Sequence, residues 1–207
     1  NGWNIEPVDG KEIAAVRAGF RNLTSMAFLL GFCYFFVQAY LFQILNLKLS
    51  NPTQSFSLLL FSFLLGNGLG SLTTKFFRGN LHRHLATVCA AIILASLLTG
   101  FVLYPMSKPH LSETGIALLL LLPAFFIGMP FPLLLKMGAE YEDRQAIPLL
   151  LGISSVAGVA ASVSAIVVSV LSGYKIVFLL GLSGYALLLL AAIVSHRNEL
   201  KNLTAKS

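Results

Sequence analysis

The stretch GIALLLLLPAFFIGMPFPLLL, from Gly115 to Leu135, decides the fold of this chain. It contains no charged residue, and its length matches the roughly 20 residues that an α-helix needs to cross the hydrocarbon core of a bilayer. Lipid offers no hydrogen-bond partner to a free backbone group, so a segment of this kind must cross the membrane as a helix. The same stretch nevertheless holds three prolines, and Gly128 lies just before the last two of them.

These prolines predict a break in the fourth membrane-spanning helix, near Gly128 to Pro132. Pro130 has no N–H to donate to the carbonyl of Phe126, and Pro132 has none for the carbonyl of Gly128. An unbonded carbonyl is costly in lipid, so the broken segment must face protein or water. Pro123, about two helical turns before Pro130, predicts a further kink.

The rest of the chain is similarly apolar. Of its 207 residues, 57% are hydrophobic and 11% are charged, and the mean hydropathy is +0.82, whereas about a quarter of the residues of a soluble domain are charged. A five-span alternative stays open, because only Ser172 to Lys175 can form the last turn. We predict an all-α membrane bundle of six transmembrane helices, at residues 23–45, 54–74, 85–105, 115–135, 147–171 and 174–195.

Little of the chain lies outside these spans. We expect a cytoplasmic or interfacial segment at 1–22, a transmembrane domain at 23–196 and a cytoplasmic tail at 197–207. In the first of these, KEIAAVRAGFR (11–21) has apolar residues at helical spacing among cations, which is typical of a helix on the membrane surface and equally of an extension of the first span. The chain begins with Asn, with no secretory signal before the first span, so we expect a fragment of a longer protein.

The distribution of Lys and Arg predicts the orientation. Eleven of the 14 are divided among the two terminal segments and the loops after the second and fourth spans. The other three, Lys48, Lys108 and Lys175, lie in the loops on the opposite side. The side richer in these residues normally stays in the cytoplasm, so both termini should be cytoplasmic, in a bacterial plasma (inner) membrane. The net charge of +6 then faces anionic lipid, and no nucleic-acid partner is needed.

Ionisable residues are missing from the middle of every predicted span, although such residues usually mark ion paths, proton relays and cofactor ligands. All eight acidic residues and all four histidines lie at span ends or outside the spans. No serine or threonine in a span has a neighbouring base that could activate it. We therefore predict no enzyme activity, no metal site and no bound cofactor, and leave open contact with a lipid, quinone or pigment.

The polar side chains that do enter the membrane are neutral. Gln38 and Gln43 lie in the first span and Asn67 in the second. Such amides commonly hold helices together by hydrogen bonds, and the alternative is that they bind a substrate. We expect Asn67, Gln38 or serines of the first, second and fifth spans to donate to the carbonyls freed by the prolines.

Small residues predict where helices approach closely. In the second span, LLGNGLGSL contains Gly66, Gly68 and Gly70, and the spacing of the first and last places both on one face. In the fifth span, Ser154, Gly158 and Ser162 lie four apart, and a second stripe of alanines runs beside them. We therefore expect helix packing at all six residues, and we expect the fifth span to be central, with neighbours on two sides.

Three segments of the chain, in order, resemble a known family. They are LFSFLLGNGLGSLTTKFF, FFIGMPFPLLLKMG and the small-residue span GISSVAGVAASVSAIVVSVLSGYKIVFLLGLSGYALLLL. Together they resemble the membrane region of spermidine synthase-like (polyamine aminopropyltransferase-like) multi-pass proteins. The resemblance covers roughly residues 28–195 and is most specific at 68–71 and 128–132. In that family the membrane region accompanies a cytoplasmic nucleotide-fold catalytic domain, whose motifs this chain does not contain. Members of the family often carry an acidic residue at the position of Gln38 and an Asn at the position of Ser154.

Three functions follow from these observations. The first is a non-catalytic membrane module, an anchor or accessory subunit of a larger complex such as a respiratory or photosynthetic assembly. The second is a small-solute transporter, because transporters often build their sites from broken helices. The third, implied by the resemblance alone, is the membrane domain of a spermidine synthase-like enzyme whose catalytic domain lies elsewhere.

Overall fold

The computed structural model describes residues 10–49, 51–77, 79–103, 113–139 and 146–204. All regular structure in these ranges is helical. The elements are α1 (Gly10–Leu49), α2 (Pro52–Thr73), the short 3₁₀ helix η1 (Thr74–Phe76), α3 (Leu81–Leu103), α4 (Glu113–Ile127), α5 (Pro130–Ala139), α6 (Ala146–Ser172) and α7 (Tyr174–Thr204).

Six helical segments of the described chain are long and apolar enough to cross a membrane. Their bounds are Gly19–Leu49, Pro52–Phe76, Leu81–Leu103, Thr114–Ala139, Ile147–Ser172 and Tyr174–Arg197. The prediction of an all-α bundle with six membrane spans is therefore confirmed, and the chain is a multi-pass membrane protein. The fourth span is divided into α4 and α5, so the predicted break near Gly128 is confirmed as well.

The first helix is longer than its predicted span. α1 runs without interruption for 40 residues, which at 1.5 Å per residue is about 60 Å, roughly twice the thickness of the hydrocarbon core. The segment 11–21 contains no proline to stop a helix, and it continues the first span instead of forming a separate surface helix. The continuous helix agrees with the second of the two interpretations of this segment.

Two local signals fix the turns between helices. Asn51 caps α2, since its side-chain oxygen accepts hydrogen bonds from the backbone N–H groups of Thr53 (3.2 Å) and Gln54 (3.4 Å). Between α6 and α7 a single residue, Gly173, forms the turn with φ of +85°, a conformation that glycine adopts without strain. This one-residue turn makes the last two spans separate helices and removes the five-span alternative.

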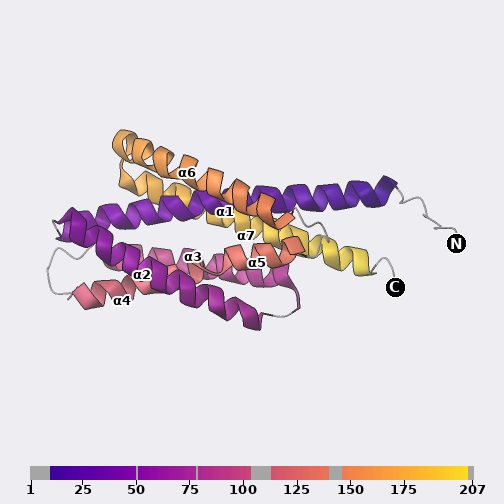
Figure 1. Cartoon of the computed structure of the whole chain (residues 1–207), viewed down its shortest axis with the longest axis horizontal. Coiled ribbons are helices and arrows are strands. Elements are labelled where there is room, and N and C mark those ends of the chain that lie inside the picture. The colour runs from indigo at the N-terminus through magenta and orange to yellow at the C-terminus, as the bar shows by residue number, and fades with distance from the viewer. Residues whose placement is uncertain (1–9, 50, 78, 104–112, 140–145, 205–207) are drawn as a thin grey trace.

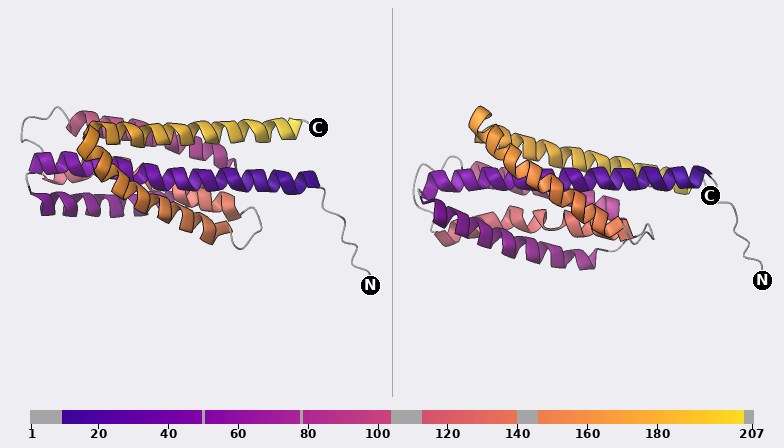
Figure 2. Two further views of the ribbon diagram at one scale, coloured as in Figure 1. Left: turned by 90° about the horizontal axis from the view of Figure 1, so that it is seen from above. Right: turned by 45° about the horizontal axis from the view of Figure 1, so that its top comes forward.

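α1 forms the centre of the bundle and packs against α6, α7 and α2, while α4 packs along α2 (Figure 1). The expectation that the fifth span is central is wrong. Only 22% of the apolar part of α6 is buried, against 50% for α1, and α6 crosses α1 obliquely at the outside of the bundle (Figure 2). The alanine stripe faces α1, where Ala157, Ala161 and Ala165 are fully buried, and the opposite face is apolar and exposed.

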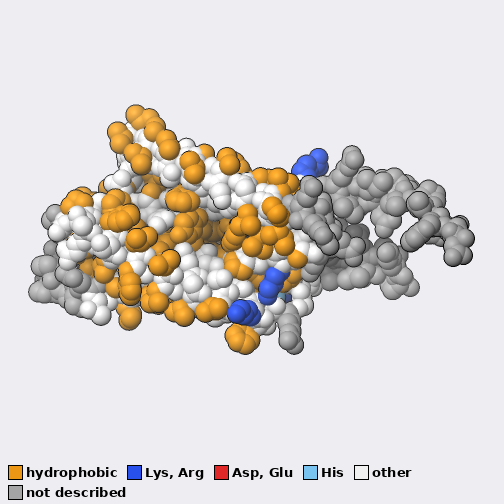
Figure 3. All heavy atoms as spheres, viewed as in Figure 1, with side chains coloured by type: hydrophobic (Ala, Val, Ile, Leu, Met, Phe, Trp, Pro, Cys, Tyr) orange, Lys and Arg blue, Asp and Glu red, His pale blue; other side chains and the backbone are white. Residues whose placement is uncertain are grey.

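The N-terminal end of α1 and the C-terminal end of α7 lie at the same end of the bundle (Figure 1). The described Lys and Arg side chains visible on the face in Figure 3 gather toward that end. Which side of the membrane this end occupies stays a prediction based on the count of cations.

Candidate functional site

The break in the fourth span leaves two residues, Gly128 and Met129, between α4 and α5. The backbone N–H of Met129 donates to the carbonyl of Phe126 at 3.2 Å, which is the carbonyl that Pro130 cannot serve. A neighbouring side chain is thus not needed there, and the expected donation from another span is wrong for this carbonyl. Pro132 lies within the first turn of α5, where a missing N–H costs no helical hydrogen bond.

The glycines of α2 bring that helix against the break. A Cβ atom on Gly66 would lie 2.6 Å from the Cβ of Ala124, and one on Gly70 would overlap the carbonyl oxygen of Phe125. From the other side, a Cβ on Gly128 would lie 2.5 Å from the Cα and carbonyl oxygen of Asn67. The two backbones are therefore in direct contact at the break, an approach that only glycine permits.

Gly68 departs from the expectation made for the three glycines together. A Cβ atom there would meet no atom within 4 Å, and the residue is exposed. It points away from α4 because it lies two positions from both Gly66 and Gly70, about 200° around the helix.

The small residues of α6 meet α1 unevenly. A Cβ on Gly31 of α1 would overlap the backbone carbonyl oxygen of Ser154, and one on Gly158 would lie 2.6 Å from Cε2 of Phe35. Ser162 instead donates its hydroxyl to the carbonyl of Val159 in its own helix, at 2.8 Å. Ser154 and Gly158 thus lie in the contact with α1, whereas the hydroxyl of Ser162 makes a bond within α6.

A cavity of about 670 Å³ lies beside the break. Its wall is formed by α1, α2, the break and the start of α5, the first half of α6, and one residue of α7. None of the described residues that line it is Asp, Glu, Lys, Arg or His. The polar lining residues are Tyr34, Asn67, Ser71, Ser154, Ser155 and Tyr185.

Two of these residues carry buried polar atoms without a protein partner. The side-chain nitrogen of Asn67 donates to the hydroxyl of Tyr34 at 3.1 Å, but its carbonyl oxygen, Oδ1, accepts no hydrogen bond. Tyr185 is 0% exposed, and its hydroxyl likewise has no partner. Leaving such a group unsatisfied costs about 1–3 kcal/mol, and both residues belong to the cavity wall.

The two amides of the first span, Gln38 and Gln43, lie outside the cavity lining. Gln43 donates from Nε2 to the hydroxyl of Ser169 at 3.0 Å, which joins α1 to α6. Gln38 is half-buried, and its oxygen has no hydrogen-bond partner. Of the three amides selected from the sequence, Asn67 is therefore the one that the fold brings to the cavity.

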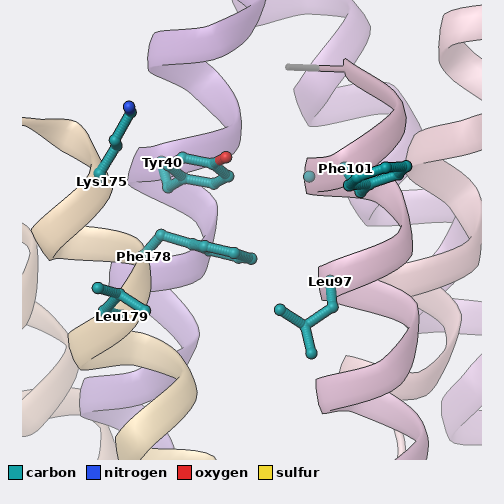
Figure 4. Close-up of a pocket in the computed structure, with 7 residues that line it drawn as sticks. Tyr40, Leu97, Phe101, Lys175, Phe178 and Leu179 are labelled. Atoms are coloured by element: carbon teal, nitrogen blue, oxygen red, sulfur yellow. The ribbon is translucent and has the colours of Figure 1, made fainter. Parts of the chain in front are cut away.

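A second cavity, of about 420 Å³, lies between α1, α3 and α7 (Figure 4). Apart from Tyr40 of α1, its lining residues come from the last turns of α3 and the first turns of α7. Its wall is mainly apolar. Tyr40 and Phe178 stack with ring centroids 4.0 Å apart on one side, and Leu97 and Phe101 face them from α3. None of the described residues that line this second cavity has a buried polar side-chain atom without a hydrogen-bond partner. The first cavity is therefore the better candidate site.

Tyr34 and Tyr185 were not selected from the sequence. Tyrosine prefers the membrane interface, where its ring is in apolar surroundings and its hydroxyl in water. A tyrosine in the middle of a span is therefore an unusual residue, and both positions could have been identified on that ground.

Comparisons with protein-family models, with curated proteins and with solved structures found no significant match to this chain. The resemblance to spermidine synthase-like membrane regions accordingly stays a prediction.

Proposed function

We propose that this protein binds a small uncharged molecule within the membrane, in the cavity beside the helix break, and acts as a carrier for it. The observation that supports this most directly is the pair of buried polar atoms, Asn67 Oδ1 and the Tyr185 hydroxyl, that lack protein partners on the cavity wall. A fitting molecule donates one hydrogen bond to the first and accepts one from the second. The absence of ionised groups among the described lining residues favours an uncharged ligand, because a charge would be left uncompensated.

The helix break supports carriage as well as binding. Carriers commonly bind their solutes near the middle of the bilayer, where a discontinuous helix lines the site. Here Gly128, at the break, and Phe131 and Pro132, at the start of α5, all line the cavity. A change in the angle between α4 and α5 would therefore alter the shape of the site directly.

Benzamide tests the binding, with benzoate as a charged analogue of the same shape. Gly68→Cys places a thiol in open space at a residue that lines the cavity. Gly152→Cys is the control, since it places a thiol in open space on α6 at a residue outside the lining. The native thiols of Cys33 and Cys89 are fully buried and set the background. In lipid nanodiscs we expect benzamide, but not benzoate, to slow the reaction of N-ethylmaleimide with Gly68→Cys and to leave Gly152→Cys unaffected.

Adding Tyr185→Phe to Gly68→Cys should abolish the protection by benzamide. The proposal is wrong if benzamide gives no protection of Gly68→Cys, or if it protects equally with and without the Tyr185 hydroxyl.

The role of anchor or accessory subunit in a plasma-membrane complex is the second candidate. It is supported by the outer face of α6, where Val156 and Val163 are exposed on the same side of the helix as Gly152, and a Cβ on Gly152 would meet no atom within 4 Å. Such a face allows another helix to approach closely. Purification in a mild detergent tests this role, since a subunit should be recovered with the same partner proteins in each preparation, and a lone monodisperse protein would contradict it.

A further inference from the structure

The rim of the cavity beside the helix break differs from its floor. At the floor, Tyr185 is 0% exposed and Ile127 is 4% exposed. At the rim, Leu64 of α2 is 74% exposed and Val159 of α6 is 67% exposed. The cavity therefore opens between α2 and α6 on the side of the bundle, and Figure 3 shows the recess on this face.

The opening leads to lipid. Leu64 and Val159 lie well inside their membrane spans, Pro52–Phe76 and Ile147–Ser172. An exposed apolar side chain at this depth contacts acyl chains, not water. A molecule in the cavity would thus have its polar end at the floor and its other end between the exposed side chains of the rim and the surrounding lipid.

From this arrangement we infer that the ligand is an uncharged amphiphile of the bilayer, which enters sideways between α2 and α6. Its head group is a hydroxyl or amide, because such a group both donates to Asn67 Oδ1 and accepts from the Tyr185 hydroxyl. Its apolar chain leaves through the rim between Leu64 and Val159. This inference rests on the proposed function and adds the ligand class and the route of entry.

The chemistry excludes other abundant amphiphiles. A phospholipid would bring its phosphate to a site whose described lining residues carry no cation, and desolvating that charge is costly. A fatty-acid ester accepts hydrogen bonds but donates none, so Asn67 Oδ1 would stay unpaired. A monoacylglycerol has hydroxyl groups that do both, and it is the probe of choice.

The experiment uses a monoacylglycerol that carries a diazirine in its acyl chain, incorporated with the protein in nanodiscs and cross-linked by light. We expect cross-links to residues of α2 and α6 at the rim, competition by unlabelled 1-monooleoylglycerol, and no competition by methyl oleate. Tyr185→Phe should lose the cross-links. Cross-links that persist in Tyr185→Phe, or that methyl oleate displaces equally, would overturn the inference.

Rim variants test the route. Leu64→Trp and Val159→Trp enlarge exposed side chains at the opening, and Val163→Trp makes the same change one turn further along α6, at a residue that is 60% exposed and outside the lining. The first two should lose the monoacylglycerol cross-links, and the control should keep them. Equal cross-linking in all three contradicts lateral entry.

Benzamide protection of Gly68→Cys separates the two proposals. If benzamide protects and the monoacylglycerol does not cross-link, the cavity binds uncharged molecules and the inference of a bilayer amphiphile is wrong. If neither ligand binds, the proposed function is wrong as well.

Discussion

Replacing Gly66 by alanine should weaken the protein at the contact between α2 and the break. The added Cβ would lie 2.6 Å from the Cβ of Ala124 and 3.0 Å from the backbone nitrogen of Phe125. Ordinary contacts between such atoms are about 3.5–4.0 Å, so the helices must separate by about 1 Å. Overpacking of this kind costs about 1–3 kcal/mol.

Gly68→Ala is the matched control, because it lies in the same helix and its Cβ meets nothing within 4 Å. Both variants gain the advantage of alanine over glycine in a helix, about 0.5–1 kcal/mol, and this gain cancels when they are compared. The free energy of unfolding of Gly66→Ala should therefore be lower than that of Gly68→Ala by about 1–3 kcal/mol.

Unfolding can be followed through the two native thiols, since Cys33 and Cys89 are both 0% exposed in the folded protein. A maleimide dye that fluoresces on reaction with a thiol reports their exposure as the detergent sodium dodecyl sulfate is titrated. Circular dichroism before titration checks that each variant begins with the same helix content. Equal unfolding midpoints for the two variants would refute the direct contact of α2 with α4.

Three further outcomes are expected. Gln43→Leu removes the hydrogen bond to Ser169 between α1 and α6 and should lower the free energy of unfolding by roughly 0.6 kcal/mol in the same thiol assay; a loss several times larger would mean that Gln43 does more than join these helices. Tyr185→Phe removes a hydroxyl that has no protein partner, so the thiol assay should show an unchanged or slightly higher free energy of unfolding, although the protection by benzamide is lost. A clear loss of stability would instead assign the hydroxyl a structural role. Cysteines at Lys11 and Lys201 should be shielded from a membrane-impermeant maleimide in intact cells while Lys175→Cys reacts, and labelling of only one end would contradict the six-span orientation.

The spans could be predicted because hydropathy and segment length are local properties. The prolines near Gly128 likewise located the break, since a missing N–H affects only the neighbouring turn. The donor to the Phe126 carbonyl was predicted wrongly because the backbone itself supplied it from Met129. A 3₁₀ turn of this kind needs no partner from another helix.

The position of α6 could not be predicted in the same way. Small residues permit a close approach, but they do not say how many neighbours a helix has. In lipid an exposed valine costs nothing, so the outward face of α6, with Val156 and Val163, has the same apolar character as a buried face. Burial therefore leaves little trace in the sequence of a membrane helix, although it is clear in that of a soluble one.

The cavity itself was not predicted from the sequence, although two of the residues that line it were singled out for other reasons. Asn67 and Gly128 were selected from the sequence and lie together because glycine lets the backbones of α2 and the break touch. Tyr185 reaches the same cavity from α7, more than fifty residues along the chain from Gly128. Such a meeting depends on the packing order of the helices, which the span pattern does not specify.

The break and the cavity are connected through α5. Phe131 and Pro132 of this short helix line the cavity, and Lys136, one turn later, donates from Nζ to the carbonyl of Thr74 just after α2. α5 is thus joined to α2 by the lysine contact and to α4 through Gly128 and Met129, and it also packs against α1, α3 and α6. Movement at these two residues would carry the cavity wall with it, while the lysine contact would hold α5 close to α2. The proposed function as a carrier requires this combination, because the site must change shape without exposing unbonded backbone to lipid.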